Sequence, residues 1–347
     1  MISTQHYASE GIRHQGEHAL IRALRGRKSV MVNTATAPVV LLCFNRPDMT
    51  ARVFSAIRAA APAELYLVMD GPRANVPHDE RLVAETRAVI SAVDWPCTVV
   101  TDFAPRNLGL KKRISSGLDF VFSHTRQAII LEDDCVPDSS FFPFMTELLS
   151  RYEDDSRVGI LGGSSRLRGH RVSSYSYDFS RDVRIWGWAT WARTWNNFSH
   201  SGDLDARWSP SQQQELLSAI PAGVRKKAMA SMLAKATELD SWALPFAVHC
   251  QKQGYLSVVP EVNLVENVGF GARSTHTTFE DFVAQVPAEP IEFPLRHPDS
   301  VAHNPLVDTM ESRLDAREWW MYPLRHPLDV AGRLVRYKWH RFAMARR

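Results

Sequence analysis

Three consecutive carboxylates, Glu132, Asp133 and Asp134, follow the apolar run of residues 128–131. The run is short, uninterrupted by polar residues and rich in isoleucine, which predicts a strand buried on both faces of a sheet with the acids at its carboxyl end. Because strand side chains alternate, Glu132 and Asp134 are predicted to point one way and Asp133 the other. Carboxylates that repel one another favour a site for a divalent cation or for sugar hydroxyls. The alternative is a solvated acidic turn ahead of the next helix.

Two further polar residues follow neighbouring apolar runs. Arg46 comes after residues 39–44, and Asp70 comes directly after residues 65–69. Because the carboxyl ends of parallel strands meet at one edge of a sheet, we expect Arg46, Asp70 and the three acids to converge there. A guanidinium can bind a carboxylate or phosphate through two N–H groups. The alternative for Asp70 is a turn-forming role before Gly71.

The elements that would position these residues alternate along the chain. Strands are predicted at 39–44, 65–69, 97–101 and 128–134, and helices at 49–60, 80–92 and 113–122. This order predicts an α/β fold with a mostly parallel sheet and right-handed crossovers. The second half is less regular, with strands expected at 158–162 and 255–259, helices at 212–220 and 224–237, a proline-rich extended segment beyond 285 and a terminal helix over 329–343.

Composition narrows the class of protein. The 347 residues include 41 Lys and Arg and 38 Asp and Glu. This near balance lacks the excess of basic residues that is usual in proteins that bind nucleic acids. Four cysteines without a CxxC pair favour reduced thiols rather than a disulfide frame or zinc site. No apolar run approaches the ~18 residues of a membrane span, and the first 30 residues lack a secretory apolar core, so a cytosolic protein is expected. The basic tail from Arg333 fits either peripheral contact with an anionic membrane or an ordinary terminal helix.

Asp240 and an aromatic group are the remaining candidates for chemistry. Asp240 could accept a proton from a hydroxyl in a group transfer, or cap a helix beginning near Trp242. Four tryptophans lie within residues 186–195, where they fit either a core or a surface on which sugars stack. Trp188 is the best candidate among them for a pocket wall, and Gly187 would let the backbone approach a ligand closely.

These motifs resemble the GT-A glycosyltransferases, nearest to the N-acetylglucosaminyltransferase I type and its bacterial family-2-like, or hemolysin-like, relatives. The resemblance covers roughly residues 37–280. It is carried, in order, by Phe44-Asn45-Arg46-Pro47, Asp70, Gly117-Leu118 with Val121-Phe122, Glu132-Asp133-Asp134-Cys135 with Asp138 and Phe141-Phe142, Gly187-Trp188, Leu239-Asp240-Ser241-Trp242, Pro260-Glu261 and Gly269-Phe270-Gly271. It implies a GT-A fold, a Rossmann-like mostly parallel sheet flanked by helices, with a less regular acceptor-side half.

The resemblance also implies domain limits. Residues 1–36 would form an N-terminal arm and residues 37–165 the half that binds the nucleotide sugar. Residues 166–285 would form the acceptor and catalytic half of the same domain, and residues 286–347 a C-terminal wrapping segment with a basic helix.

Site roles follow from the same likeness. Asp134 would bind the metal, manganese or magnesium, and Asp133 the ribose. Glu132 and Asp70 would hold donor groups, with Arg46 supporting Asp70 and the base pocket, and Gly187, Trp188 and Arg273 would complete the donor site. Arg113 stands where the family has a histidine beside the nucleobase. Asp240 would be the catalytic base, although Ser241 replaces the second acid often found there, and residues 269–277, with Arg273 and His276, would form a flexible loop over the diphosphate.

The function expected from the residues and the resemblance together is a metal-dependent, inverting glycosyltransferase. It would move a sugar from a nucleotide-diphosphate donor to a hydroxyl of a glycan or lipid-linked acceptor, and the family implies decoration of a bacterial surface glycan. A sugar-phosphate nucleotidylyltransferase is an alternative, but it would have a glycine-rich phosphate loop where this chain has Asn45-Arg46-Pro47. A catalytically inactive protein that binds nucleotides or glycans on the same fold is the third reading.

Overall fold

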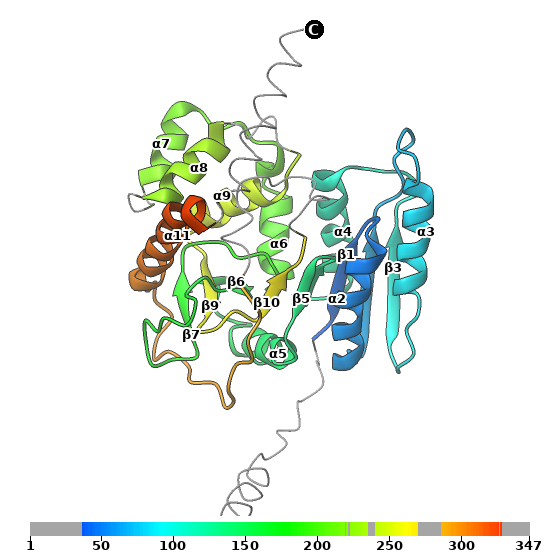
Figure 1. Ribbon diagram of the computed structural model, residues 1–347, viewed down its shortest axis with the longest axis horizontal. Coiled ribbons are helices and arrows are strands. Elements are labelled where there is room, and N and C mark those ends of the chain that lie inside the picture. Colours follow the sequence, from blue (N-terminus) through cyan, green and yellow to red (C-terminus); the bar gives the residue numbers. More distant parts are fainter. Residues whose placement is uncertain are drawn as a thin grey trace, which may run out of the picture. The chain divides into compact units, whose positions relative to one another are not determined.

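The computed structural model describes residues 37–218, 220, 223–234, 240–269, 286–325 and 327. The first half alternates strands and helices as predicted (Figure 1). Its elements are β1 (Val39–Cys43), α2 (Pro47–Ala60), β2 (Glu64–Met69), α3 (Asp79–Ile90), β3 (Thr98–Phe103), α4 (Leu110–His124) and β4 (Gln127–Glu132). Helix α2 begins two residues earlier than expected because Pro47 fixes a backbone angle suited to a first helical position.

The second half contains shorter elements. They are β5 (Cys135–Pro137), α5 (Phe141–Arg151), β6 (Val158–Gly162), β7 (Tyr177–Ser180), β8 (Trp188–Trp191), α6 (Ala192–Ser199), the 3-10 turn η1 (Asp203–Asp205), α7 (Pro210–Ser218), α8 (Val224–Ala234), α9 (Ala243–Gln253), β9 (Leu256–Pro260), β10 (Val265–Asn267) and α11 (Pro305–Arg325). Strands β5, β7 and β10 are only three or four residues long, too short to show a period in the sequence.

Within the described residues, eight strands form one sheet in the order β3-β2-β1-β4-β8-β6-β9-β7. Strands β1, β2, β3, β4, β6 and β9 run in one direction, and β7 and β8 run in the other. The predicted α/β class, with a mostly parallel, Rossmann-like sheet flanked by helices, is therefore confirmed. Because β8 pairs with both β4 and β6, the two halves of the chain share this sheet.

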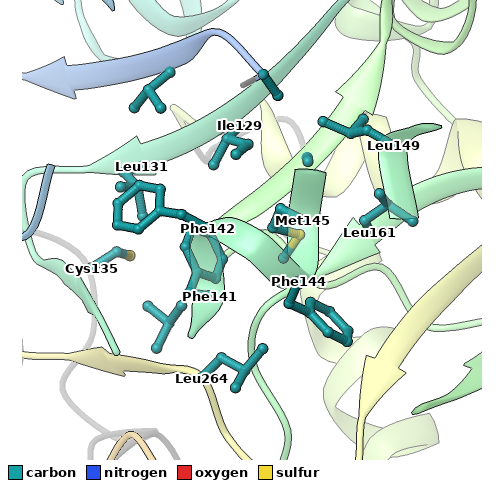
Figure 2. Packing of buried hydrophobic residues seen from close by; sticks show 14 of the residues in the cluster. Ile129, Leu131, Cys135, Phe141, Phe142, Phe144, Met145, Leu149, Leu161 and Leu264 are labelled. Atoms are coloured by element: carbon teal, nitrogen blue, oxygen red, sulfur yellow. The ribbon is translucent and has the colours of Figure 1, made fainter. Parts of the chain in front are cut away.

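The apolar core lies on both faces of the sheet, as unbroken hydrophobic strands predict. Val39 and Leu41 belong to one buried cluster and Val40 and Leu42 to another, as expected of alternating side chains. Helix α5 covers β4 on the first face, where Phe141, Phe142 and Met145 lie close to Ile129 and Leu131 (Figure 2). Helices α4, α6 and α9 supply the second cluster. Close packing on both faces holds the strand ends in fixed positions.

The C-terminal segment differs from its prediction. Residues 286–304 contain no helix or strand, but α11 begins at Pro305 instead of the chain staying extended to residue 328. Asn304 donates its backbone N–H to the carbonyl of Phe179 at 2.8 Å and its Nδ2 to Asp178 at 2.9 Å. These bonds hold α11 where its acids meet Arg184, which is buried, and Arg166, which is partly exposed. Local sequence does not reveal such a tertiary contact. The helix predicted over 329–343 lies outside the described residues, and among those described no helix has the length and apolarity to cross a membrane.

Candidate functional site

The carboxyl ends of β1, β2 and β4 lie side by side at one edge of the sheet, which we call the rim. Strand β1 pairs with β2 on one side, with Cys43 opposite Met69, and with β4 on the other, with Leu42 opposite Glu132. The backbone N–H of Asp70 donates to the carbonyl of Cys43 at 3.2 Å. Asp70 and the acidic triplet therefore flank the end of β1, as the parallel arrangement predicted.

Arg46 links two of the three acids. Its guanidinium forms a close two-pronged pair with Asp133, including a bond from Nε at 3.3 Å, and donates from Nη1 to Asp134 at 2.9 Å. The predicted alternation of these acids is wrong, because β4 ends at Glu132 and residues 133–134 form a turn that brings both aspartates to one cation. Arg46 was expected to support Asp70, but its described hydrogen bonds to carboxylates run to Asp133 and Asp134.

The acidic triplet places three carboxyl groups beside a single guanidinium, that of Arg46. Burial raises the pKa of Glu132, and the neighbouring charges of Asp134 and Asp133 raise it further, while Arg46 opposes the shift. Burial also raises the pKa of Asp133 in spite of Arg46. Three carboxylates beside one guanidinium suit a second cation with oxygen ligands, which would lower these pKa values in turn.

Asp134 is the acid best placed to receive such a cation. The antiparallel pair of β5 and β10 brings Gly269 over it, and a Cβ on Gly269 would lie only 2.1 Å from Asp134 Oδ2. The side chain of Asp134 retains 14% exposure, against 3% for Asp133. Among the described residues, no three His, Cys, Asp or Glu side chains form a complete metal-binding group. A single carboxylate still fits a cation whose other ligands are phosphates and water.

Asp70 is buried and anchors the loop between β3 and α4. Its Oδ1 accepts hydrogen bonds from the backbone N–H groups of Gly71 at 2.8 Å and Leu108 at 2.9 Å, and its Oδ2 accepts one from Asn107 Nδ2 at 2.9 Å. Burial raises the pKa of Asp70, and the backbone hydrogen bonds oppose this. Asp70 therefore does stabilise a turn, as the alternative expected. Its contact with the nucleotide-sugar donor stays a prediction. Asn107 was missed because its partner lies 37 residues away in sequence.

Asp240 lies at the amino end of α4. Its Oδ2 accepts the N–H of Leu110 at 3.1 Å and its Oδ1 that of Lys111 at 3.2 Å. The alternative expected for Asp240 was a cap on the helix that follows it. The side chain of Trp242, the N-cap residue of α9, forms no capping hydrogen bond. Asp240 instead binds the amino end of α4, which is distant in sequence. Since the adjoining loop is anchored to Asp70, this contact brings Asp240 to the segment that Asp70 holds.

Arg113, predicted beside the nucleobase, is buried under the end of β3. Its Nη2 donates to the carboxylate of Asp102 and, at 3.0 Å, to the carbonyl of the same residue. Its Nε has no hydrogen-bond partner in the described part of the chain. The guanidinium lies near enough to Asp70 for its charge to lower the pKa of that carboxyl. Arg113 therefore belongs to the same side of the rim, and its contact with a base stays a prediction.

Gly187 and Trp188 have packing roles. Gly187 has φ +58°, and a Cβ there would lie 2.5 Å from Val265, so a glycine is needed. Trp188 is fully buried and stacks on Trp242, with ring centroids 5.8 Å apart. The interpretation of Trp188 as a pocket wall is corrected, because its ring faces core side chains on the second face of the sheet. Arg273 and His276 lie outside the described residues.

A second group of polar residues shapes the rim and was not predicted. Asp79, almost fully buried at the start of α3, accepts hydrogen bonds from Asn45 Nδ2 at 2.6 Å and from Arg73 Nε at 2.7 Å. Asn45 follows β1 and Arg73 follows β2, and the Arg73 guanidinium lies 5.3 Å from the Phe44 ring centroid. Asp79 thus ties together the loops that carry Arg46 and Asp70. The available signal was an acid directly before the helix predicted over 80–92, which is equally well explained by a favourable interaction with the helix dipole.

Asp79 gives a pH-dependent prediction. Hydrogen bonds from Arg73 lower its pKa to about 2 in the folded protein. A depressed folded pKa adds stability above the pKa of the unfolded chain, and that stability is lost as the pH falls towards 2. We expect Asp79→Asn to cost about 1.5–3 kcal/mol near neutral pH, as for hydrogen bonds to charged groups. Urea titrations at several pH values should show this cost shrinking below pH 4, and a pH-independent difference would contradict the assignment.

The fold and the site together define a Rossmann-like α/β protein with an acidic rim. No family model and no curated protein sequence matches the chain. Among solved structures, it is similar to a mannosyltransferase from Pyrobaculum calidifontis in complex with GDP-Man and Mn2+, at 14% identity and a TM-score of 0.35 over 70% of this chain and 78% of that one. It is also similar to a UDP-glucose pyrophosphorylase complexed with UDP-glucose, at 10% identity and a TM-score of 0.30 over 63% of this chain and 89% of that one. Both likenesses are loose.

Proposed function

We propose that this protein is an inverting, metal-dependent glycosyltransferase that uses a nucleotide-diphosphate sugar as donor. The observation that supports this best is the convergence at one rim of residues from distant parts of the chain. Arg46 joins Asp133 and Asp134, while Asp70 and Asp240 hold the two ends of the loop that enters α4. Carboxylates and a guanidinium gathered at strand ends suit a ligand that combines hydroxyls, phosphates and a cation.

Asp240 is the proposed general base. Inverting transfer needs one carboxylate to take the proton of the incoming hydroxyl on the side of the sugar opposite the leaving diphosphate. The two backbone N–H groups at α4 use one lone pair on each oxygen of Asp240. A carboxylate offers about four acceptor positions, so a hydroxyl can still bind. The exposure of Asp240 leaves that approach open to an acceptor.

Asp134 and Arg46 are proposed to serve the leaving group. A bound divalent cation at Asp134 would supply Lewis-acid stabilisation of the departing diphosphate. Arg46, which is partly exposed at 27%, would orient Asp133 and Asp134 through the bonds described above. Glu132 and Asp133 would then accept hydrogen bonds from sugar or ribose hydroxyls, and Asp70 would stabilise the loop beside the nucleotide. The acceptor is proposed to be a glycan or lipid-linked hydroxyl.

A thermal-shift panel of nucleotide sugars with and without Mn2+ tests the donor and the metal. A ligand at a hundredfold its Kd stabilises a fold by roughly 2.7 kcal/mol. We expect at least one nucleotide sugar to raise the Tm only when Mn2+ is present, and chelation with EDTA to reverse the shift. Asp134→Asn should abolish the manganese-dependent part. Asp154→Asn, an exposed acid before β6 at the opposite end of that strand from the rim, should retain it.

The outcomes separate the readings of the site. Hydrolysis or transfer of a labelled donor, alongside the manganese-dependent shift, supports a glycosyltransferase. Binding without turnover on water or any acceptor favours an inactive binding protein, and formation of a nucleotide sugar from a sugar phosphate and a nucleoside triphosphate favours a nucleotidylyltransferase. A panel in which no nucleotide sugar changes the Tm, with or without manganese, would sink the proposal.

A further inference from the structure

The loop entering α4 is held by two carboxylates from distant parts of the chain. Asp70 accepts the N–H of Leu108, and Asp240 accepts those of Leu110 and Lys111. Asn107 reinforces the first contact by donating to Asp70 Oδ2 at 2.9 Å and to the carbonyl of Gly71 at 3.1 Å. Residues 107–109, which lead into α4, are thus fixed to Asp70, and the first two residues of α4 bind Asp240 directly after them.

The amino end of α4 orients the Asp240 carboxylate. The first N–H groups of a helix have no partner within it, and the helix dipole favours a negative charge at that end. Asp240 takes two of these N–H groups, one with each oxygen, across 130 and 129 residues of sequence. Two bonds to two oxygens fix both the position of the carboxylate and the rotation of its plane.

Gly109 is the residue that allows this approach. It has φ +81°, and a Cβ built on it would lie 2.9 Å from Asp240 Oδ2. A side chain at position 109 would therefore strain the backbone and push the carboxylate away from Leu110. We infer that Gly109 is a positioning residue for Asp240, setting where the base meets the acceptor hydroxyl. This inference rests on the proposed function of Asp240 as general base.

The kinetic test compares Gly109→Ala with Gly254→Ala. Gly254 ends α9, also has a positive φ of +71°, and a Cβ there would meet no atom within 4 Å. Gly254 has a left-handed helical backbone (φ +71°, ψ +19°), whereas Gly109 has φ +81° and ψ +158°, a region almost restricted to glycine. Gly109→Ala therefore carries the larger backbone strain, and of the two variants it alone displaces Asp240. We expect Gly109→Ala to lower kcat roughly 10- to 100-fold, the scale of a misplaced reacting group, with the donor Kd unchanged. Gly254→Ala should keep the kcat of the unmodified protein. Equal kcat values for the two variants would overturn the inference.

The Asp240→Asn background shows whether Gly109 acts through Asp240. If it does, adding Gly109→Ala to Asp240→Asn should lower kcat no further, because the misplaced group is already inactive. A further fall of the size seen in the single variant would assign Gly109 a separate role and overturn the inference.

Amide hydrogen exchange tests the contact without any turnover. The N–H groups of Leu110 and Lys111 should be protected in the unmodified protein and exchange faster in Gly109→Ala and in Asp240→Ala, while Gly254→Ala leaves them unchanged. Full protection in Gly109→Ala would overturn the inference, whatever the kinetics. Loss of protection with unchanged kcat would overturn it while leaving the glycosyltransferase assignment intact. An unmodified protein with normal protection but no turnover would overturn the proposed function, and with it the role of Gly109.

Discussion

Asp240→Asn should lower the kcat for donor hydrolysis and for transfer by about 10²- to 10⁴-fold, the usual contribution of a general base. Asparagine matches the shape of aspartate and can still accept an N–H from α4, but its amide cannot take a proton from the incoming hydroxyl. The fold and the affinity for the nucleotide sugar should therefore change little. Initial rates with an isotope-labelled donor, paired with thermal denaturation of the same samples, measure both quantities.

Asp205→Asn provides the matched control. Asp205 accepts a bond from Lys111 Nζ at 2.5 Å, so it meets the same turn of α4, and its side chain is 84% exposed. The substitution removes the same charge from the same neighbourhood and should leave kcat nearly unchanged. If Asp240→Asn and Asp205→Asn have similar kcat values, Asp240 only caps α4, and another group accepts the proton of the incoming hydroxyl.

Glu311→Ala should lower the free energy of unfolding by about 3–5 kcal/mol, the range for removing one partner of a buried ion pair. Glu311 on α11 is fully buried, pairs closely with Arg184 and accepts the backbone N–H of Arg166 at 2.9 Å. The substitution leaves Arg184, which is 5% exposed, with Asp182 at 3.9 Å as a distant ionic partner. Urea unfolding followed by circular dichroism measures the loss.

Glu318→Ala on the same helix is the control for this prediction. Its ion pair with Arg325 is partly exposed, at 25% and 48% of the two side chains, and such pairs contribute about 0–1 kcal/mol. Replacing both Arg184 and Glu311 by apolar residues should recover part of the stability that Glu311→Ala loses, since no buried charge remains unpaired. Equal losses in Glu311→Ala and Glu318→Ala would show that the buried pair does not secure α11.

The sequence was informative where local pattern and tertiary structure agree. Unbroken apolar runs gave the parallel strands of the first half, and the rule that their carboxyl ends share an edge placed Arg46, Asp70 and the acidic triplet together. The pattern failed where a partner distant in sequence decides the outcome. Helix α11 was missed because its acids are satisfied by Arg184 and Arg166, which precede it by more than a hundred residues.

Within the site, the same distinction separates what could be predicted from what could not. The orientation of the two aspartates depended on where β4 stops, and the strand ends at Glu132, before both of them. Trp188 lies in a run of tryptophans that fits a core and a sugar platform equally well, and only the packing against Trp242 decides between them. Asp240 was identified from a resemblance, whereas its contact with α4 depends on a helix end that no local motif marks.

The strands of this sheet are not synthesised in the order in which they lie side by side. β4 leaves the ribosome well before β8, and β8 lies between β4 and β6 in the finished sheet. Until residues 188–191 are synthesised, the nascent polypeptide presents an apolar strand with one unpaired edge, which invites association with other chains. A fragment ending after β6 would keep that edge open, so we expect it to associate with other chains when it is produced alone.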